Sequence, residues 1–269
     1  MDIILNIIKG IVLGIANVIP GVSGGTMAVV LGVYNKLIHS VNNFFKDIKG
    51  NFKFLFQIAI GLGIGVVLFS NIITILLKTY PQQTNFLFIG LILGTCPLLY
   101  KEASKEKVRP INYLWFILAL ALLIVMSILK PVNATATIIR TVTLGNCFKL
   151  ISAGFVAALA MVLPGISGSF VLLLLGLYTS LTTAVKEFNI ILLLVVTFGV
   201  VVGFLTMTKL VESLFHKFPQ SAYCIILGLV LGSIFAIYPG FTFNSSGLFS
   251  ILTLIIGISI SFFIGKKEI

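Results

Sequence analysis

Two short segments of this chain combine proline, glycine and serine in a pattern that could bind an anion. They read Pro20-Gly-Val-Ser-Gly-Gly-Thr26 and Pro164-Gly-Ile-Ser-Gly-Ser169. Proline ends a helix, glycine leaves backbone amides uncovered, and serine or threonine caps the helix that restarts. Such a restart directs free N–H groups and a positive dipole end toward the break, which suits negative charge. The residues predicted to contact the ligand are Asn17, Pro20, Gly21, Ser23, Gly24, Gly25, Thr26, Pro164, Gly165, Ser167, Gly168 and Ser169.

Helix termini alone are too weak to hold an ionised group inside a membrane. One terminus contributes roughly 0.3–2 kcal/mol, whereas a bare charge in hydrocarbon costs on the order of tens of kcal/mol. A cation or water must therefore assist, and among the nearest cations Arg140 and Lys149 are predicted to join the site. For Arg140 the alternative is an interfacial side chain that snorkels to the lipid headgroups.

Two other interpretations of the glycine-serine segments compete with anion binding. One is a structural kink packed by glycine, which a serine in both copies makes less favoured. The other is an intramembrane serine protease of the rhomboid type, which carries a G-x-S-G string and needs a histidine base near the serine. The chain has only His39 and His216, and 16 residues of helix beyond Ser23 place His39 about 24 Å away at ~1.5 Å per residue. The chain is therefore not expected to be an enzyme.

The composition requires a membrane environment for these segments. Hydrophobic residues make up 59% of the 269 residues and charged residues 9%, and the mean hydropathy is +1.19. A soluble or disordered chain cannot have this balance. The net charge of +11 comes from lysines and arginines in short gaps between apolar runs, which indicates membrane topology and contact with lipid headgroups, with no nucleic-acid partner. The three cysteines show no C-x-x-C spacing, so no metal, disulfide or cofactor is predicted.

The chain repeats itself. At an offset of 144 the first glycine-serine segment aligns with the second, and Tyr34 aligns with Tyr178; beyond the basic loop the offset becomes 138 and Pro81 aligns with Pro219. We interpret this as a tandem duplication, with residues 1–133 and 134–269 as two repeats of one integrated domain. Asn17 is polar where its repeat partner is Met161, and it is expected either to hydrogen-bond the exposed backbone or to reach the ligand.

The distribution of basic residues favours an inverted relation between the repeats. If each broken segment is a hairpin that enters and leaves on one face, 13 of the 18 Lys and Arg residues lie on the cytoplasmic side; if each is one crossing, the split is nine to nine. The predicted fold is therefore an all-α polytopic membrane protein. It has two inverted repeats, each a broken re-entrant helix hairpin plus three transmembrane helices, and both termini are cytoplasmic.

The paired motifs Asn17-Val-Ile-Pro-Gly-Val-Ser-Gly-Gly-Thr26 and Val162-Leu-Pro-Gly-Ile-Ser-Gly-Ser-Phe170 resemble those of the PopT-type polyprenyl-phosphate translocases. The resemblance covers nearly the whole chain. It implies a transporter of the bacterial cell membrane that returns undecaprenyl phosphate from the outer to the inner leaflet for reuse in envelope synthesis. Many members of that family have an acid where this chain has Asn17. If that acid carries protons there, this chain either lacks such coupling or places it elsewhere.

The partners expected on these grounds are polyprenyl phosphate and membrane lipids. The sequence leaves open a coupling ion, proton or sodium, and a homo-oligomeric assembly. A channel or carrier for small soluble anions is the alternative function, because it would use the same helix termini. The two functions differ in whether the site opens sideways to lipid or only to water.

Overall fold

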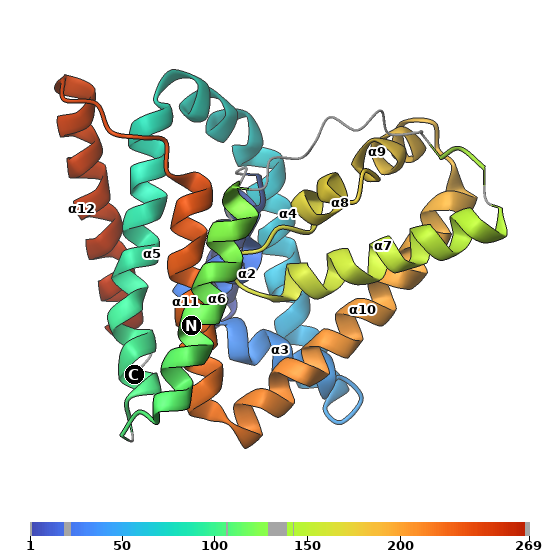
Figure 1. Cartoon of the computed structure of the whole chain (residues 1–269), viewed down its shortest axis with the longest axis horizontal. Helices are drawn as coiled ribbons and strands as arrows, with labels where there is room; N and C mark the ends of the chain where they lie inside the picture. Colours follow the sequence, from blue (N-terminus) through green and yellow to red (C-terminus); the bar gives the residue numbers. More distant parts are fainter. Residues whose placement is uncertain (1, 19–22, 106, 129–138, 142, 267–269) are drawn as a thin grey trace.

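The computed structural model describes residues 2–18, 23–105, 107–128, 139–141 and 143–266, which form twelve helices. Figure 1 shows their arrangement. In chain order the helices are α1 (Asp2–Val18), α2 (Gly24–Val30), α3 (Tyr34–Asn42), α4 (Ile48–Thr79), α5 (Pro81–Ala103), α6 (Pro110–Ile128), α7 (Leu144–Val162), α8 (Gly168–Leu174), α9 (Tyr178–Lys186), α10 (Ile190–Lys217), α11 (Pro219–Ile237) and α12 (Ser245–Lys266).

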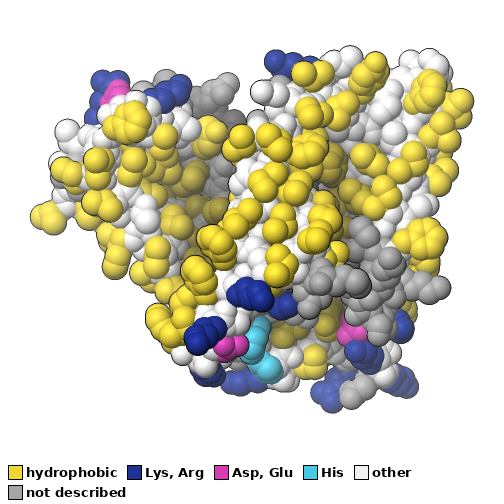
Figure 2. Space-filling model, turned by 180° about the vertical axis from the view of Figure 1, so that it is seen from behind, with side chains coloured by type: hydrophobic (Ala, Val, Ile, Leu, Met, Phe, Trp, Pro, Cys, Tyr) yellow, Lys and Arg dark blue, Asp and Glu magenta, His cyan; other side chains and the backbone are white. Residues whose placement is uncertain are grey.

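Seven of these helices are long and apolar enough to cross a membrane. Six of them, α4, α5, α6, α10, α11 and α12, fall on the three spans expected in each half, and the seventh is α7, expected as the first limb of the second hairpin. The prediction of an all-α polytopic membrane protein is confirmed. Large apolar side chains remain exposed along these helices, and they cover much of the face in Figure 2. Such a surface faces lipid, because water would not tolerate it.

Glycines allow the long helices to pack with their backbones in close contact. A Cβ atom added at Gly10 or Gly14 of α1 would collide with the backbone of α4, and one at Gly199 or Gly203 of α10 would collide with that of α7. Within lipid, small residues at the contact favour helix association because they allow close van der Waals packing. The pairs α1–α4 and α7–α10 therefore form one packed arm in each half.

The two halves also exchange helices. α12 packs along α5, which belongs to the first half, and α6 packs along α11, which belongs to the second; Figure 1 shows α12 beside α5. Gly90 and Gly94 of α5 meet the backbone of α12, and Gly228 of α11 meets that of α6. The halves are therefore interlocked, and the predicted boundary between residues 133 and 134 lies outside the described residues.

The sequence repeat has a counterpart in the local structure. α2 and α8 have seven residues each, α3 and α9 have nine each, and both pairs keep the offset of 144. The turn between the short helices contains Gly32 at φ 67° in the first half and Gly176 at φ 69° in the second, a left-handed conformation that favours glycine. α9 is bent by 113° relative to α8, so the chain turns sharply after the second break.

Candidate functional site

The first break is the interval between the end of α1 at Val18 and the start of α2 at Gly24. Two hydroxyl groups lie at the start of α2. Ser23 is the N-cap, and its Oγ accepts a hydrogen bond from the Thr26 amide at 3.1 Å. The Ser23 and Thr26 hydroxyl oxygens lie 2.9 Å apart, and both residues are buried. The predicted capping roles of Ser23 and Thr26 are thus observed as an N-cap and its first-turn partner. The predicted ligand contacts Pro20 and Gly21 lie outside the described residues.

The second break lies between α7 and α8, and its hydrogen bonds differ from those at the start of α2. α7 ends at Val162, Pro164 is fully buried, and Gly165 takes φ +84°. Ser167 is the N-cap of α8, yet its side chain makes no capping bond; its Oγ instead lies 2.7 Å from the Ser169 hydroxyl. The first-turn amides of Gly168 and Ser169 have no hydrogen-bond acceptor within the described residues.

The two breaks meet. The Gly165 amide donates to the Ser23 hydroxyl at 2.8 Å and to the Thr26 hydroxyl at 2.6 Å. Gly25 lies against Leu163, where an added Cβ would be 3.2 Å from the carbonyl oxygen. The expectation that bare amides line both breaks therefore does not hold for Gly165, since hydroxyls of the first break occupy its N–H group.

A cavity of about 790 Å³ lies between the two breaks. This volume is within the range of small-molecule sites. Apolar side chains of α3, α4, α8 and α10 form much of its wall. The predicted site residues that line it are Asn17, Ser23, Gly24, Gly25, Ser167, Gly168 and Ser169.

Other predicted residues lie beside the cavity or away from it. Thr26, Pro164 and Gly165 are not part of the lining and instead form the contact between the breaks. Arg140 pairs with Glu187 at 3.2 Å, and Lys149 is exposed on α7. Neither cation lines the cavity, and its described lining contains no Lys or Arg. Hydroxyls and amides are therefore the hydrogen-bond donors that the described lining offers to an anion.

Asn17 lies where the sequence places it, at the edge of the first break. Its Nδ2 donates to the Leu13 carbonyl at 2.8 Å, one turn back in α1. A Cβ atom added at Gly24 would lie 2.9 Å from this Nδ2 and 3.0 Å from Oδ1. The amide thus packs over the first residue of α2 and borders the cavity, and its backbone bond is to its own helix.

The geometry gives no support to a serine protease. Neither His39 nor His216 lines the cavity; both border a separate space of about 300 Å³ between α3 and α10. Ser23 Oγ is engaged by Thr26 and Gly165. A nucleophilic serine needs a base within hydrogen-bond reach, and no histidine in the described part of the chain provides one at either break.

The sequence reasoning missed two tyrosines as site residues. Tyr34 and Tyr178 begin α3 and α9, and both line the cavity. Tyr34 is 6% exposed and donates from its hydroxyl to the Val162 carbonyl at 2.9 Å, whereas Tyr178 is 39% exposed. The signal was present, because the repeat aligns these two tyrosines with each other. The alignment does not show that the two side chains differ in burial and in hydrogen bonding.

Comparison with known proteins gives one family. Residues 13–250 match the VCA0040-like family, described as undecaprenyl phosphate translocase-like. A polyprenyl-phosphate transporter of Staphylococcus aureus is 35% identical over 97% of this chain and 96% of its own, and one of Vibrio cholerae is 30% identical over 92% and 83%. No solved structure gives a significant match. With a family match across both breaks and relatives similar over nearly their whole length, the chain belongs to the undecaprenyl phosphate translocase-like family, as its motifs predicted.

Proposed function

We propose that this protein carries undecaprenyl phosphate from the outer to the inner leaflet of the bacterial cell membrane, with the phosphate bound between the two breaks. The observation that carries the proposal is the cavity of about 790 Å³, which both breaks line with serine hydroxyls and glycine backbone. The similar proteins named polyprenyl-phosphate transporters support the choice of ligand.

The phosphate group would be held by short-range donors. α2 and α8 have only seven residues each, so their dipoles are small, and individual amides and hydroxyls matter more than the helix as a whole. Gly168 and Ser169 offer amides that have no acceptor within the described residues, and Ser167 adds a hydroxyl. Water that enters with the phosphate completes its hydration, since a bare anion in hydrocarbon is too costly.

The apolar wall of the cavity suits the first isoprene units of the tail. Leu62 of α4, Leu173 of α8 and Phe204 of α10 all line the cavity, and each is more than a third exposed. A small soluble anion makes no use of these contacts, whereas the first isoprene units can pack against them while the rest of the tail stays in lipid. The wall therefore favours a lipid phosphate over an inorganic anion.

The charge distribution supports the orientation in the membrane that we propose. Figure 2 shows most of the visible Lys and Arg side chains, together with histidine, along the lower edge of the molecule. We assign this edge to the cytoplasm by the positive-inside rule, with both termini on that side and the two halves inverted about the cavity. Alternating exposure of the cavity would then move the headgroup between leaflets while the tail stays in lipid.

A leaflet-resolved assay tests the proposal. Purified protein in vesicles that contain undecaprenyl phosphate in one leaflet should move it to the other faster than protein-free vesicles do. Inorganic phosphate and the neutral polyprenol serve as competitors. If both compounds compete only weakly with undecaprenyl phosphate, the site recognises the headgroup and the tail together. Uptake of inorganic phosphate into the vesicles, with no lipid movement, would instead identify a carrier of small anions.

A further inference from the structure

The equivalent tyrosines of the two repeats are in opposite environments. Tyr34 is buried, its hydroxyl donates to the Val162 carbonyl, and its ring centroid lies 6.4 Å from that of Phe215 on α10. Tyr178 lies at the same repeat position, yet its side chain borders the cavity and its hydroxyl has no hydrogen-bond partner within the described residues. The tyrosine of the first half thus bonds to the second half, and its equivalent in the second half makes no such bond within the described residues.

The carbonyl that Tyr34 uses also has an equivalent. Val162 is the last residue of α7, and Val18 is the last residue of α1, at the offset of 144 that relates Tyr178 to Tyr34. The bond from Tyr34 to Val162 ties the first repeat to the second. The bond related to it by the repeat would run from the Tyr178 hydroxyl to the Val18 carbonyl and would tie the second repeat to the first.

Helix packing is unequal in the same sense. α3 packs on α10, across the boundary between the halves, whereas the principal partners of α9 are α8 and α10 of its own half. The contact of α3 with α10 has no equivalent between α9 and α4 among the principal helix contacts. One side of the cavity is therefore sealed by an inter-repeat contact that the other side lacks.

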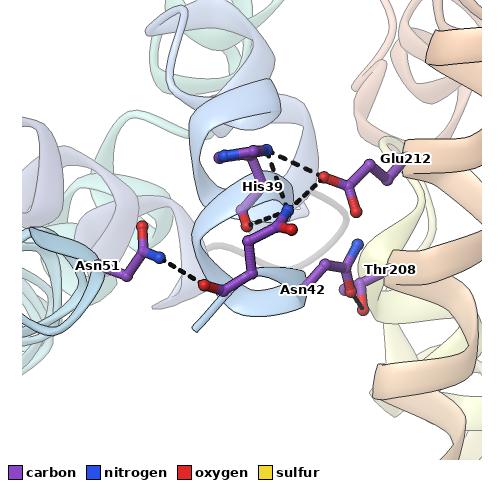
Figure 3. Close-up of polar contacts among 6 residues, drawn as sticks. His39, Asn42, Asn51, Thr208 and Glu212 are labelled. Carbon is purple, nitrogen blue, oxygen red and sulfur yellow. Dashed lines mark hydrogen bonds and ion pairs between the residues drawn. The ribbon is translucent and has the colours of Figure 1, made fainter. Parts of the chain in front are cut away.

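Polar side chains connect α3 to α10, as Figure 3 shows. They lie at the edge of the molecule where Lys and Arg gather in Figure 2, here called the basic edge. Thr208 donates to Asn42 Oδ1 at 2.7 Å, and Glu212 Oε1 lies 2.8 Å from Asn43 Nδ2 and 3.0 Å from His39 Nδ1. The buried Asn42 Nδ2 has no partner within the described part of the chain. An unpaired buried amide lowers the net stability of a contact, so this set of bonds suits a surface that must also open.

We propose that Tyr34 and Tyr178 are alternating gate residues of the transporter. In the present state Tyr34 is bound to the end of α7 and α3 is closed on α10. In the other state the Tyr34 bond is broken, Tyr178 binds the Val18 carbonyl, and α9 closes toward α4. This inference rests on the proposed function, because it takes the two halves to be inverted around one transported headgroup.

The energetics allow such an exchange. Each state makes one tyrosine–carbonyl bond and breaks the other, so the two gates offset each other. A single net hydrogen bond shifts a two-state equilibrium by about fivefold. The contacts of Thr208 and Glu212 with α3 are additional to that exchange, which biases the molecule toward closure at the basic edge.

The test uses paired phenylalanine variants and a cavity reporter. In a background with Cys96, Cys147 and Cys224 replaced by alanine, Leu173→Cys places one thiol in the cavity wall. A membrane-impermeant maleimide is applied to sealed vesicles from either side, without substrate. Tyr34→Phe is expected to shift the ratio of labelling about fivefold toward the side of α3, and Tyr178→Phe about fivefold toward the side of α9.

Two further variants decide between a gate and a structural role. Thr208→Val removes the bond to Asn42 and should shift labelling in the same direction as Tyr34→Phe. Tyr113→Phe, on the exposed face of α6, should leave the ratio unchanged. Shifts of Tyr34→Phe and Tyr178→Phe in the same direction, or no shift in either, would overturn the gate even if the protein moves lipid. Opposite shifts in a protein that moves no lipid would keep the gate and refute the proposed cargo.

Discussion

The two breaks have nearly the same sequence and yet make different contacts. Ser23 caps its own helix and also receives the amide of the opposite break, whereas Ser167 pairs with Ser169 at the edge of the cavity. Tyr34 is buried, and Tyr178 is exposed. The Ser23 and Tyr34 hydroxyls thus bond across the repeats in the present conformation, whereas the Ser167 hydroxyl bonds only within its own break. The first break is the structural partner here, and the second is the open one.

The largest effect is expected when the start of α8, in the second break, is crowded against α7. Gly168→Leu is expected to reduce transport by about a hundredfold or more, because an added Cβ already lies 2.5 Å from Met161 Cγ and 3.0 Å from the Ala157 carbonyl oxygen. The leaflet-resolved assay measures this loss. Gly63→Leu is the matched control, since nothing lies within 4 Å of its added Cβ, and it should retain transport. Equal activity of the two variants would remove the second break from the transport path.

A smaller effect is expected where the breaks touch. Thr26→Val removes one of the two hydroxyls that receive the Gly165 amide, and it should lower the free energy of unfolding by about 1–2 kcal/mol. Thermal unfolding in detergent measures this change. The control Thr182→Val removes a hydroxyl that bonds only to carbonyls of its own helix, and it should stay within about 0.5 kcal/mol of the parent protein. An unchanged Thr26→Val would mean that the contact between breaks contributes nothing to stability.

Ser167→Ala should have the reverse profile. We expect stability to change by less than about 0.5 kcal/mol, because the hydroxyl bonds only Ser169, while affinity for the lipid phosphate falls about tenfold through loss of one charge-assisted bond. Titration with a short-chain polyprenyl phosphate measures the affinity. Ser23→Ala is the comparison variant, and there the larger change should be in stability. If both serines behave alike, the two breaks are not specialised.

The smallest effect is expected at the predicted cation. Arg140→Gln breaks an exposed ion pair with Glu187, and such pairs contribute about 0–1 kcal/mol. Transport should stay within about twofold of the parent protein if Arg140 serves topology rather than the phosphate. A tenfold loss in the leaflet-resolved assay would return Arg140 to the binding site. Lys149→Gln gives the same test for the second predicted cation.

Much of the local structure could be predicted from the sequence. Proline, glycine and serine at fixed spacing located the second break and the restart of α8, and the cap at Ser23 follows from the same chemistry, whereas the Ser167 side chain makes no capping bond. Six spans followed from continuous apolar runs. Motif spacing and apolar runs are local properties of the sequence, so these features could be predicted without knowledge of tertiary contacts.

The features that the sequence could not supply all depend on long-range packing. Ser23 reaches Gly165 over 142 positions, and α12 packs on α5 rather than on its own half. Arg140 was predicted at the site because it is near in sequence and charged, but a local partner, Glu187, lies 3.2 Å away. The repeat alignment also treats the two tyrosines as equivalent. It therefore does not predict that the Tyr34 hydroxyl bonds a carbonyl of the opposite repeat while the Tyr178 hydroxyl does not.

The exchange of α6 and α12 between the halves has a consequence for biogenesis. The glycine face of α5 is covered only after α12 has been synthesised, because α12 is its main packing partner. During synthesis that face remains uncovered in the bilayer until α12 has been inserted. A first half produced alone would lack this partner, so the packing of α5 cannot be completed before α12 is in place.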